Sequence, residues 1–200
     1  MAKSNQILWL DLETGGLDPA ETGIVEIGGI FQWPGQERTR RIFERQADPR
    51  KGRDGMIDES VEIHPKALEV NHLTMAEIET FQSIDKAVTE LDSFVEPWCV
   101  IAGWNVANFD IPFLKAAYKR AGLTWRFHYH CLDMMVVANF LKFAGKIDSY
   151  SLSLANVCKY LGIDQSQFGP AHRALPDVYA TVAVAKEFQD RFFGSRKVRI

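Results

Sequence analysis

The sequence has little cysteine and no long apolar run. Its 200 residues include 3 cysteines, Cys99, Cys131 and Cys158, which are far apart and stand in apolar contexts. This excludes a disulfide-rich secreted scaffold and favours reduced cysteines in an intracellular protein. The longest later apolar stretch, Met134 to Leu141, contains Asn139, whereas a bilayer-spanning helix needs about 20 apolar residues. We therefore expect a soluble, cytoplasmic protein with no membrane partner.

The sequence also lacks an excess of positive charge. Its formal net charge is -3, from 23 Lys and Arg against 26 Asp and Glu. This excludes tight, charge-driven binding along a duplex, but it allows a nuclease that grips only a few nucleotides. The apolar fraction of 46% is enough for a core, and the length suits one domain. We predict a single domain over residues 1–200, with its core from about residue 7 to residue 190.

The hydrophobic pattern predicts a mixed sheet with helices on its faces. Three strands come first, and their short connections favour antiparallel pairing: Ile7–Leu12, Ile24–Trp33 and Thr39–Gln46. Helices are then interleaved with two more strands, Cys99–Ala102 and Arg126–Cys131. The expected helices are Ser83–Val95, Asn108–Ala121, Met134–Phe143, Ser151–Leu161 and Leu175–Phe192. This order predicts an α/β fold with a five-stranded mixed sheet, and it resembles the ribonuclease-H-like fold.

Acidic residues stand at the end of the first expected strand. Asp11 and Glu13 are two positions apart, so their side chains point to the same face and can reach one metal ion. An unpaired carboxylate in such an apolar segment is costly. Thr14, Gly15 and Gly16 follow in a tight turn, where the glycines let the backbone come close to a ligand. The first motif therefore predicts a site at this strand end.

Two further acidic positions and one histidine occur near expected helix starts. Asp110 follows the short buried strand Cys99–Ala102, which would bring it beside Asp11. His172 precedes the last helix, and Asp177 lies in its first turn. Each acid alone is explained equally well by the favourable field at a helix N-terminus. Together with the first motif, they predict one site assembled from distant parts of the chain.

Phosphodiester hydrolysis needs this set of groups. A water must be activated on one side of the phosphorus and a leaving oxygen stabilised on the other, which two divalent ions roughly 4 Å apart can do. Mg²⁺, or Mn²⁺ in its place, prefers oxygen ligands such as these four carboxylates. A histidine near neutrality can take the proton from the attacking water. We predict two Mg²⁺ ions on Asp11, Glu13, Asp110 and Asp177, with His172 as general base.

The three motifs resemble those of the DEDDh, or DnaQ-like, 3′→5′ exonucleases. Asp11-Leu-Glu-Thr-Gly-Gly-Leu17 looks like the first motif of that family, and Asn105-Val-Ala-Asn-Phe-Asp110 like the second. His172-Arg-Ala-Leu-Pro-Asp177 looks like the third, and the tract around it is especially similar to that of exonuclease I. The resemblance covers roughly Ile7 to Asp190. It implies a ribonuclease-H-like fold and removal of nucleotides from a 3′ end.

The resemblance also implies substrate contacts. Thr14 would lie at the terminal 3′-hydroxyl, with Leu17 and Phe109 against the terminal bases, and Gly15 would also contact the substrate. The segment Ile63–Thr74 looks like a loop of the family over the site, so Val70 and Asn71 would touch the last nucleotide.

The predicted function is hydrolysis of single-stranded DNA from the 3′ end to nucleoside 5′-monophosphates. An RNA-trimming exoribonuclease is the alternative among enzymes, because the sequence does not show how the site meets a 2′-hydroxyl. A catalytically silent nucleic-acid-binding or polymerase-associated module is the alternative from another class, and a small-molecule phosphodiesterase is a third. A polymerase or repair protein is a conceivable partner, and the sequence does not indicate an oligomeric state.

Overall fold

A computed structural model describes residues 6–33 and 40–194. Its centre is a six-stranded sheet in the order β4-β3-β2-β1-β5-β6. The strands are β1 (Ile7–Thr14), β2 (Ile24–Gln32), β3 (Arg40–Asp48), β4 (Gln82–Ser83), β5 (Val100–Gly103) and β6 (Leu132–Asp133). β1 pairs antiparallel with β2 and parallel with β5, so the sheet is mixed, as predicted.

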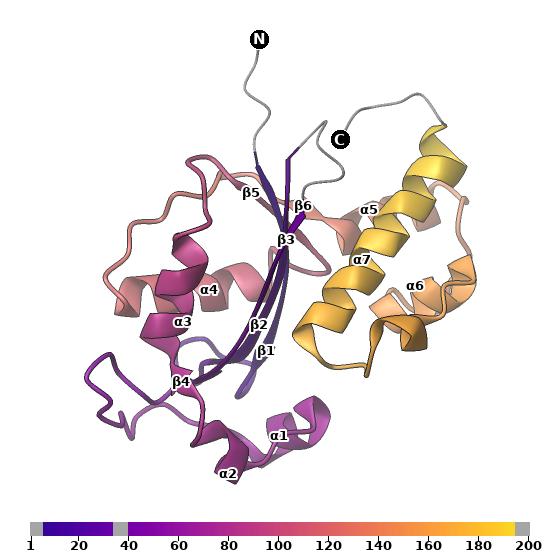
Figure 1. Cartoon of the computed structure of the whole chain (residues 1–200). Coiled ribbons are helices and arrows are strands. Elements are labelled where there is room, and N and C mark those ends of the chain that lie inside the picture. The colour runs from indigo at the N-terminus through magenta and orange to yellow at the C-terminus, as the bar shows by residue number, and fades with distance from the viewer. Residues whose placement is uncertain (1–5, 34–39, 195–200) are drawn as a thin grey trace.

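Helices cover both faces of this sheet (Figure 1). The helices are α1 (Pro65–Asn71), α2 (Met75–Ile78), α3 (Ile84–Asp92), α4 (Asp110–Arg120), α5 (Met134–Phe143), α6 (Leu154–Leu161) and α7 (Ala174–Phe188). Two short helical segments, η1 (Gln165–Phe168) and η2 (Gln189–Phe193), flank α7. α3 and α4 pack on one face and α7 on the other, as Figure 1 shows. The predicted α/β architecture is therefore confirmed. No helix in the described ranges is both long enough and apolar enough to cross a bilayer.

β1 divides its side chains between two cores. Leu8, Leu10 and Leu12 join the core under α3 and α4, whereas Ile7 and Trp9 join the core under α7. Since alternate residues of a strand face the same side, the next positions on the α7 side are Asp11 and Glu13. On the α7 side of β1, the apolar residues are therefore followed by two carboxylates at the end of the strand.

The strand count differs from the expected five because β4 and β6 have only 2 residues each. No alternating pattern can be recognised over so short a run. The strand predicted over Arg126–Cys131 was wrong. Only Phe127 bridges to Cys99 there, and the strand proper follows at β6. Here the ring of Tyr129 clusters with two histidine rings instead, with centroids 4.5 Å from His128 and 4.0 Å from His130.

Several element boundaries also differ from the prediction. The loop expected over Ile63–Thr74 contains α1, which begins at Pro65. α6 begins at Leu154 and not at Ser151, because the hydroxyl of Ser153 accepts the N–H of Asn156 and caps the helix. The regular α7 ends at Phe188 and continues as a π-turn. Thr39, the expected start of the third strand, lies outside the described residues.

Candidate active site

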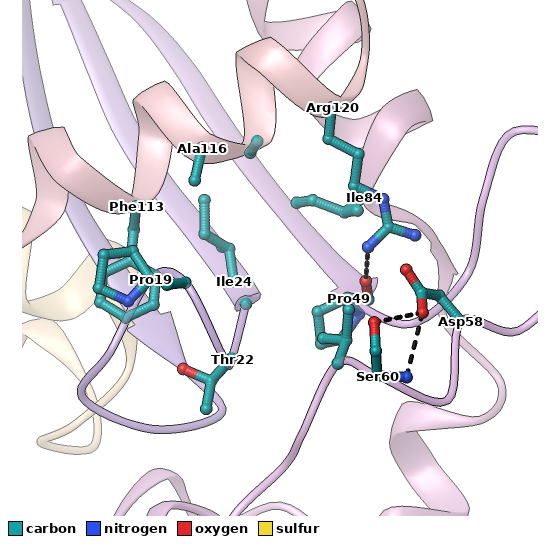
Figure 2. Close-up of a pocket in the computed structure, with 14 residues that line it drawn as sticks. Pro19, Thr22, Ile24, Pro49, Asp58, Ser60, Ile84, Phe113, Ala116 and Arg120 are labelled. Atoms are coloured by element: carbon teal, nitrogen blue, oxygen red, sulfur yellow. Dashed lines mark hydrogen bonds between the residues drawn. The ribbon is translucent and has the colours of Figure 1, made fainter.

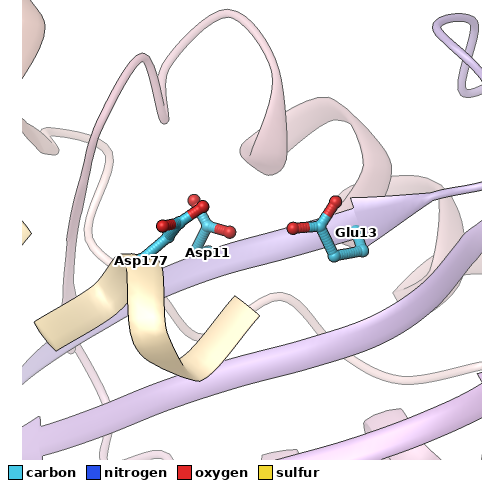
Figure 3. Close-up of side chains that lie close together, drawn as sticks. All are labelled: Asp11, Glu13 and Asp177. Carbon is cyan, nitrogen blue, oxygen red and sulfur yellow. The ribbon is translucent and has the colours of Figure 1, made fainter. Parts of the chain in front are cut away.

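Three of the predicted acidic residues meet at the end of β1. One carboxylate oxygen from each of Asp11, Glu13 and Asp177 lies within 4.8 Å of the others. Figure 3 shows Asp11 and Glu13 rising from the same side of β1, with Asp177 reaching them from the first turn of α7. The i, i+2 spacing on β1 places the first two, and the direction of α7 places the third. The structure therefore brings together residues that are far apart in the sequence.

Asp110, from α4, lies next to these three carboxylates and bonds to β1. It is the first residue of α4, and its side chain is almost fully buried, at 2% exposure. Its Oδ1 accepts the backbone N–H of Leu12 at 2.9 Å, between the two β1 acids. Among the neighbouring charges, Asp110 contributes most to raising the pKa of Asp11. The carboxylate is therefore held at the cluster, as the sequence predicted.

His172 lies at the exposed edge of the site, directly before the start of α7. Its backbone is left-handed, with φ of 57°, which is uncommon for a residue with a side chain. Burial raises the pKa of Asp177, and the adjacent side chain and backbone of His172 partly oppose this rise. His172 therefore stands next to the carboxylate cluster and open to solvent.

Burial raises the pKa of every carboxyl in this cluster, and repulsion between its members adds to the rise for Asp11 and Glu13. Burial raises the pKa of Glu13 to about 8, with further contributions from Asp177, Glu26 and Asp110. Burial likewise raises the pKa of Asp110 to about 8. The pKa of Asp11 is raised well above its ordinary value by burial and by the neighbouring acids, and that of Asp177 is raised by burial. Such a group of acids requires positive charge to ionise near neutral pH.

Divalent cations fit this donor set. Across residues 6–33 and 40–194, no ion pair involves Asp11, Glu13, Asp110 or Asp177. The site offers only carboxylate oxygens, which Mg²⁺ and Mn²⁺ prefer. These four side chains could therefore hold such ions, which would compensate the charge that the protein leaves uncompensated.

The residues predicted to contact a substrate surround the end of β1. The hydroxyl of Thr14 donates to the carbonyl of Gly16 at 2.6 Å, and the N–H of Gly15 donates to the carbonyl of Gly23 at 2.7 Å. These bonds fix the turn after Glu13. Leu17 projects from this turn and is 84% exposed. A large apolar side chain so exposed beside a cluster of acids is available for contact with a ligand.

Three further predicted contacts come from α1 and from the segment before α4. The amide of Asn71 is buried and donates to the carbonyl of Thr14 at 3.0 Å, so it ties α1 to the end of β1. Val70, the preceding residue, is exposed. Phe109 is half-buried against Phe113, with ring centroids 5.1 Å apart. Val70 is therefore accessible at the surface, whereas Asn71 is buried and holds α1 against the end of β1.

Asp133 organises the site, although the sequence analysis did not identify it. Its carboxylate accepts backbone N–H groups of Asn105 and Ala107, each at 3.1 Å. It also accepts those of Met135 and Val136 at the start of α5. A carboxylate directly before a helix is a capping signal, but that signal does not reveal the bonds to the distant segment that leads to Asp110.

A pocket of about 220 Å³ lies between the segment that follows β1, the loop after β3 and α4 (Figure 2). Apolar side chains such as Pro19, Ile24 and Phe113 line one part of it. At the other end, Arg120 donates to the carbonyl of Pro49, and the hydroxyl of Ser60 donates to Asp58. The pocket contains none of the five predicted catalytic residues.

Gly28 allows α7 to approach the sheet closely enough to deliver Asp177. A Cβ at this position would lie 2.4 Å from the backbone carbon of Ala174 and 2.5 Å from the nitrogen of Leu175. We expect Gly28→Ala to push the start of α7 outward, to destabilise the protein by about 1–3 kcal/mol, and to reduce activity. Thermal unfolding and turnover of a labelled oligonucleotide would measure the two effects.

Gly29 provides the matched control, because a Cβ there would come closest to the end of the Leu8 side chain, at 2.9 Å, with the nearest backbone atom 3.6 Å away. Gly29→Ala should therefore retain most of the activity. Equal activity in the two variants would show that the approach of α7 does not govern the site.

Comparison with known proteins identifies this arrangement. Residues 8–185 match the RNase_T exonuclease family. The chain belongs to this exonuclease family. It is 33% identical over 180 residues to the PolC-type DNA polymerase III of Thermotoga maritima, which covers 90% of the chain and 11% of the polymerase. It is 25% identical to the oligoribonuclease of Idiomarina loihiensis, over 96% of both proteins.

The fold of this exonuclease-family chain is also found in solved structures. A structure of E. coli exonuclease I in complex with a dA16 oligonucleotide superimposes with a TM-score of 0.76 at 22% identity, over 94% of this chain and 41% of that one. A zinc-bound complex of the same enzyme with single-stranded DNA gives a TM-score of 0.74. The chain therefore spans about a tenth of the polymerase relatives and less than half of exonuclease I.

Exonucleases of this family depend on divalent metal, so the raised pKa values predict a pH effect that metal should change. An acid whose pKa is raised on folding holds its proton more tightly when folded, so its contribution to stability is present below the unfolded pKa of about 4. That contribution is lost as the pH rises through the folded values, about 8 for Glu13 and Asp110. The metal-free protein should thus lose stability between about pH 4 and about pH 8.

Divalent ions should reverse this loss, because they bind the ionised form. At 100 times its Kd an ion adds about 2.7 kcal/mol, which for a chain of this size raises the Tm by roughly 5–10 °C. Thermal unfolding with chelator and with Mg²⁺ or Mn²⁺, at pH 6 and pH 9, would test this. The metal-dependent rise should be larger at pH 9. A rise that is absent, or larger at pH 6, would contradict the proposed metal site.

Proposed function

We propose that this protein is a metal-dependent 3′→5′ exonuclease that hydrolyses single-stranded DNA to nucleoside 5′-monophosphates. The observation that carries the proposal is the convergence of three carboxylates from β1 and α7, with Asp110 bonded between the two β1 acids and His172 at the open edge. Membership of the exonuclease family gives the reaction class.

Each of the five residues has a role in this proposal. Asp11, Glu13, Asp110 and Asp177 hold two divalent ions, Mg²⁺ or Mn²⁺. When bound, the ions supply the positive charge that favours an attacking hydroxide and a leaving alkoxide. His172 accepts the proton of the attacking water, because it is exposed and adjacent to the cluster.

The substrate strand enters, in this proposal, over the turn after β1. Thr14 and Gly15 lie at the terminal 3′-hydroxyl, and Leu17 and Phe109 contact the terminal bases. Val70 contacts the last nucleotide from the surface of α1, and Asn71 holds that helix against Thr14. Apolar contacts of this kind tolerate any base, as a general exonuclease requires.

The preference for DNA rests on two relatives whose names specify it. One is a DNA polymerase with 33% identity over the matched segment, and the other is exonuclease I in complex with DNA oligonucleotides. The match within a polymerase also supports a polymerase partner. An exoribonuclease is the second candidate, because the Idiomarina oligoribonuclease matches this chain over 96% of both lengths.

The test uses single-stranded DNA and RNA of the same sequence, labelled at the 5′ end, with Mg²⁺ and with chelator. We expect a ladder that shortens from the 3′ end, faster on DNA, and nucleoside 5′-monophosphates as products. A faster ladder on RNA would favour the exoribonuclease. Binding of either strand without cleavage, in Mg²⁺ and in Mn²⁺, would favour the silent nucleic-acid-binding module.

A further inference from the structure

A buried ion pair joins the start of α7 to the strand beside the site. Nε of Arg173 donates to Oε2 of Glu26 at 2.8 Å, and Nη2 donates to Oε1 at 3.2 Å. The side chain of Glu26 is completely buried, at 0% exposure, and that of Arg173 is about one-third exposed. A bidentate, charge-assisted contact of this kind fixes the orientation of both side chains.

Both partners occupy positions next to the proposed reaction centre. Glu26 on β2 is the direct cross-strand neighbour of Glu13 on β1. Arg173 is the residue before α7, and its own neighbour in the chain is His172. The ion pair therefore connects the strand that carries Glu13 to the segment that carries the histidine.

The segment that carries His172 needs such a connection. The left-handed backbone of His172 is unfavourable for a residue with a side chain, so it persists only where the surrounding structure imposes it. Arg173 occupies the N-cap position of α7, but its side chain makes no capping hydrogen bond there. Instead, that side chain is committed to Glu26.

We propose that Arg173, anchored by Glu26, is a positioning residue that holds His172 in place at the carboxylate cluster. The proposal rests on the exonuclease function given above. Neither Arg173 nor Glu26 touches the substrate in this account. Together they fix the backbone from which the histidine projects, while the close approach of Ala174 to Gly28 fixes the next turn.

The pair also has a purely structural interpretation, since loss of one partner from a buried ion pair leaves an uncompensated charge and destabilises the fold. The double variant Glu26→Gln/Arg173→Gln separates the two interpretations, because it removes both charges together. We expect it to remain folded, to keep the metal-dependent rise in Tm, and to lose on the order of 10²-fold in kcat with little change in KM. Arg173→Lys retains a positive charge but not the bidentate contact. Its kcat should therefore lie between that of the unmodified protein and that of the double variant.

A matched control is the pair Arg126 and Asp92, which is also bidentate but lies away from the site. Asp92→Asn/Arg126→Gln should leave kcat unchanged. Hydrogen exchange of the metal-free proteins gives a readout independent of catalysis. Exchange in residues 169–174 should increase in the Glu26/Arg173 double variant, and exchange in β1 should not.

The outcomes are distinguishable. A double variant with the kcat of the unmodified protein, or with unchanged exchange in residues 169–174, would overturn the positioning role. If the unmodified protein shortens neither DNA nor RNA, the exonuclease proposal fails instead. The exchange measurement alone then decides whether the ion pair holds the segment.

Discussion

Asp11→Asn should abolish exonuclease activity and, at the same time, stabilise the metal-free protein. Asp11 is close to both Glu13 and Asp177, so replacing its carboxylate by a neutral amide weakens the binding of a cation at this cluster. The loss of one such group from a preorganised site lowers kcat by at least about 10²–10³-fold, which brings turnover down to background. The substitution also removes the cost of a buried carboxylate among other acids, because burial and then the acidic neighbours raise the pKa of Asp11.

Two measurements test this pair of effects. Turnover of a labelled single strand should fall to background, and the Tm in chelator at pH 8 should exceed that of the unmodified protein. Asp190→Asn, which removes an exposed acid after α7, should change neither property. An Asp11→Asn variant that cleaves normally would remove Asp11 from the site. One that loses activity and also unfolds more readily in chelator would indicate a structural role.

His172→Ala should have the second large effect, with a different signature. Removal of a general base lowers the rate by roughly 10²–10⁴-fold. The four carboxylates are untouched, so Mg²⁺ should still raise the Tm as it does in the unmodified protein. Single-turnover cleavage and thermal unfolding, with and without Mg²⁺, would measure both.

The exposed His130 gives a control, since its ring contacts Tyr129 and lies outside the carboxylate cluster. His130→Ala should retain full activity. Undiminished cleavage by His172→Ala would assign proton transfer to another group. A His172→Ala protein that no longer responds to Mg²⁺ would make the histidine part of the metal site instead.

The sequence predicted the parts of the site that depend on local geometry. Strand alternation placed Asp11 and Glu13 on one face, and helical spacing placed Asp177 in the first turn of α7. The bond from Leu12 to Asp110 depends on how α4 packs across β1, so no local pattern could predict it. The sequence placed Asp110 near Asp11 because it follows the strand Cys99–Ala102, but it did not predict this bond.

Other features depend on pairing between distant segments. The pairing of β1 with β2 places Glu26 opposite Glu13. The charge of Glu26, in an otherwise apolar strand, lies next to the site only because of this register. The need for glycine at position 28 becomes visible only once α7 lies across β2. The two-residue strands β4 and β6 are likewise defined by their partners rather than by their own sequence.

The most direct test of the central claim compares a linear and a circular single-stranded DNA of the same sequence. Both would be incubated with Mg²⁺ and with chelator, the linear strand carrying its label at the 5′ end. The account predicts that the linear strand shortens stepwise from its 3′ end, that the circle stays intact, and that chelator stops the reaction. A nicked circle, or a linear strand that survives in both Mg²⁺ and Mn²⁺, would contradict it.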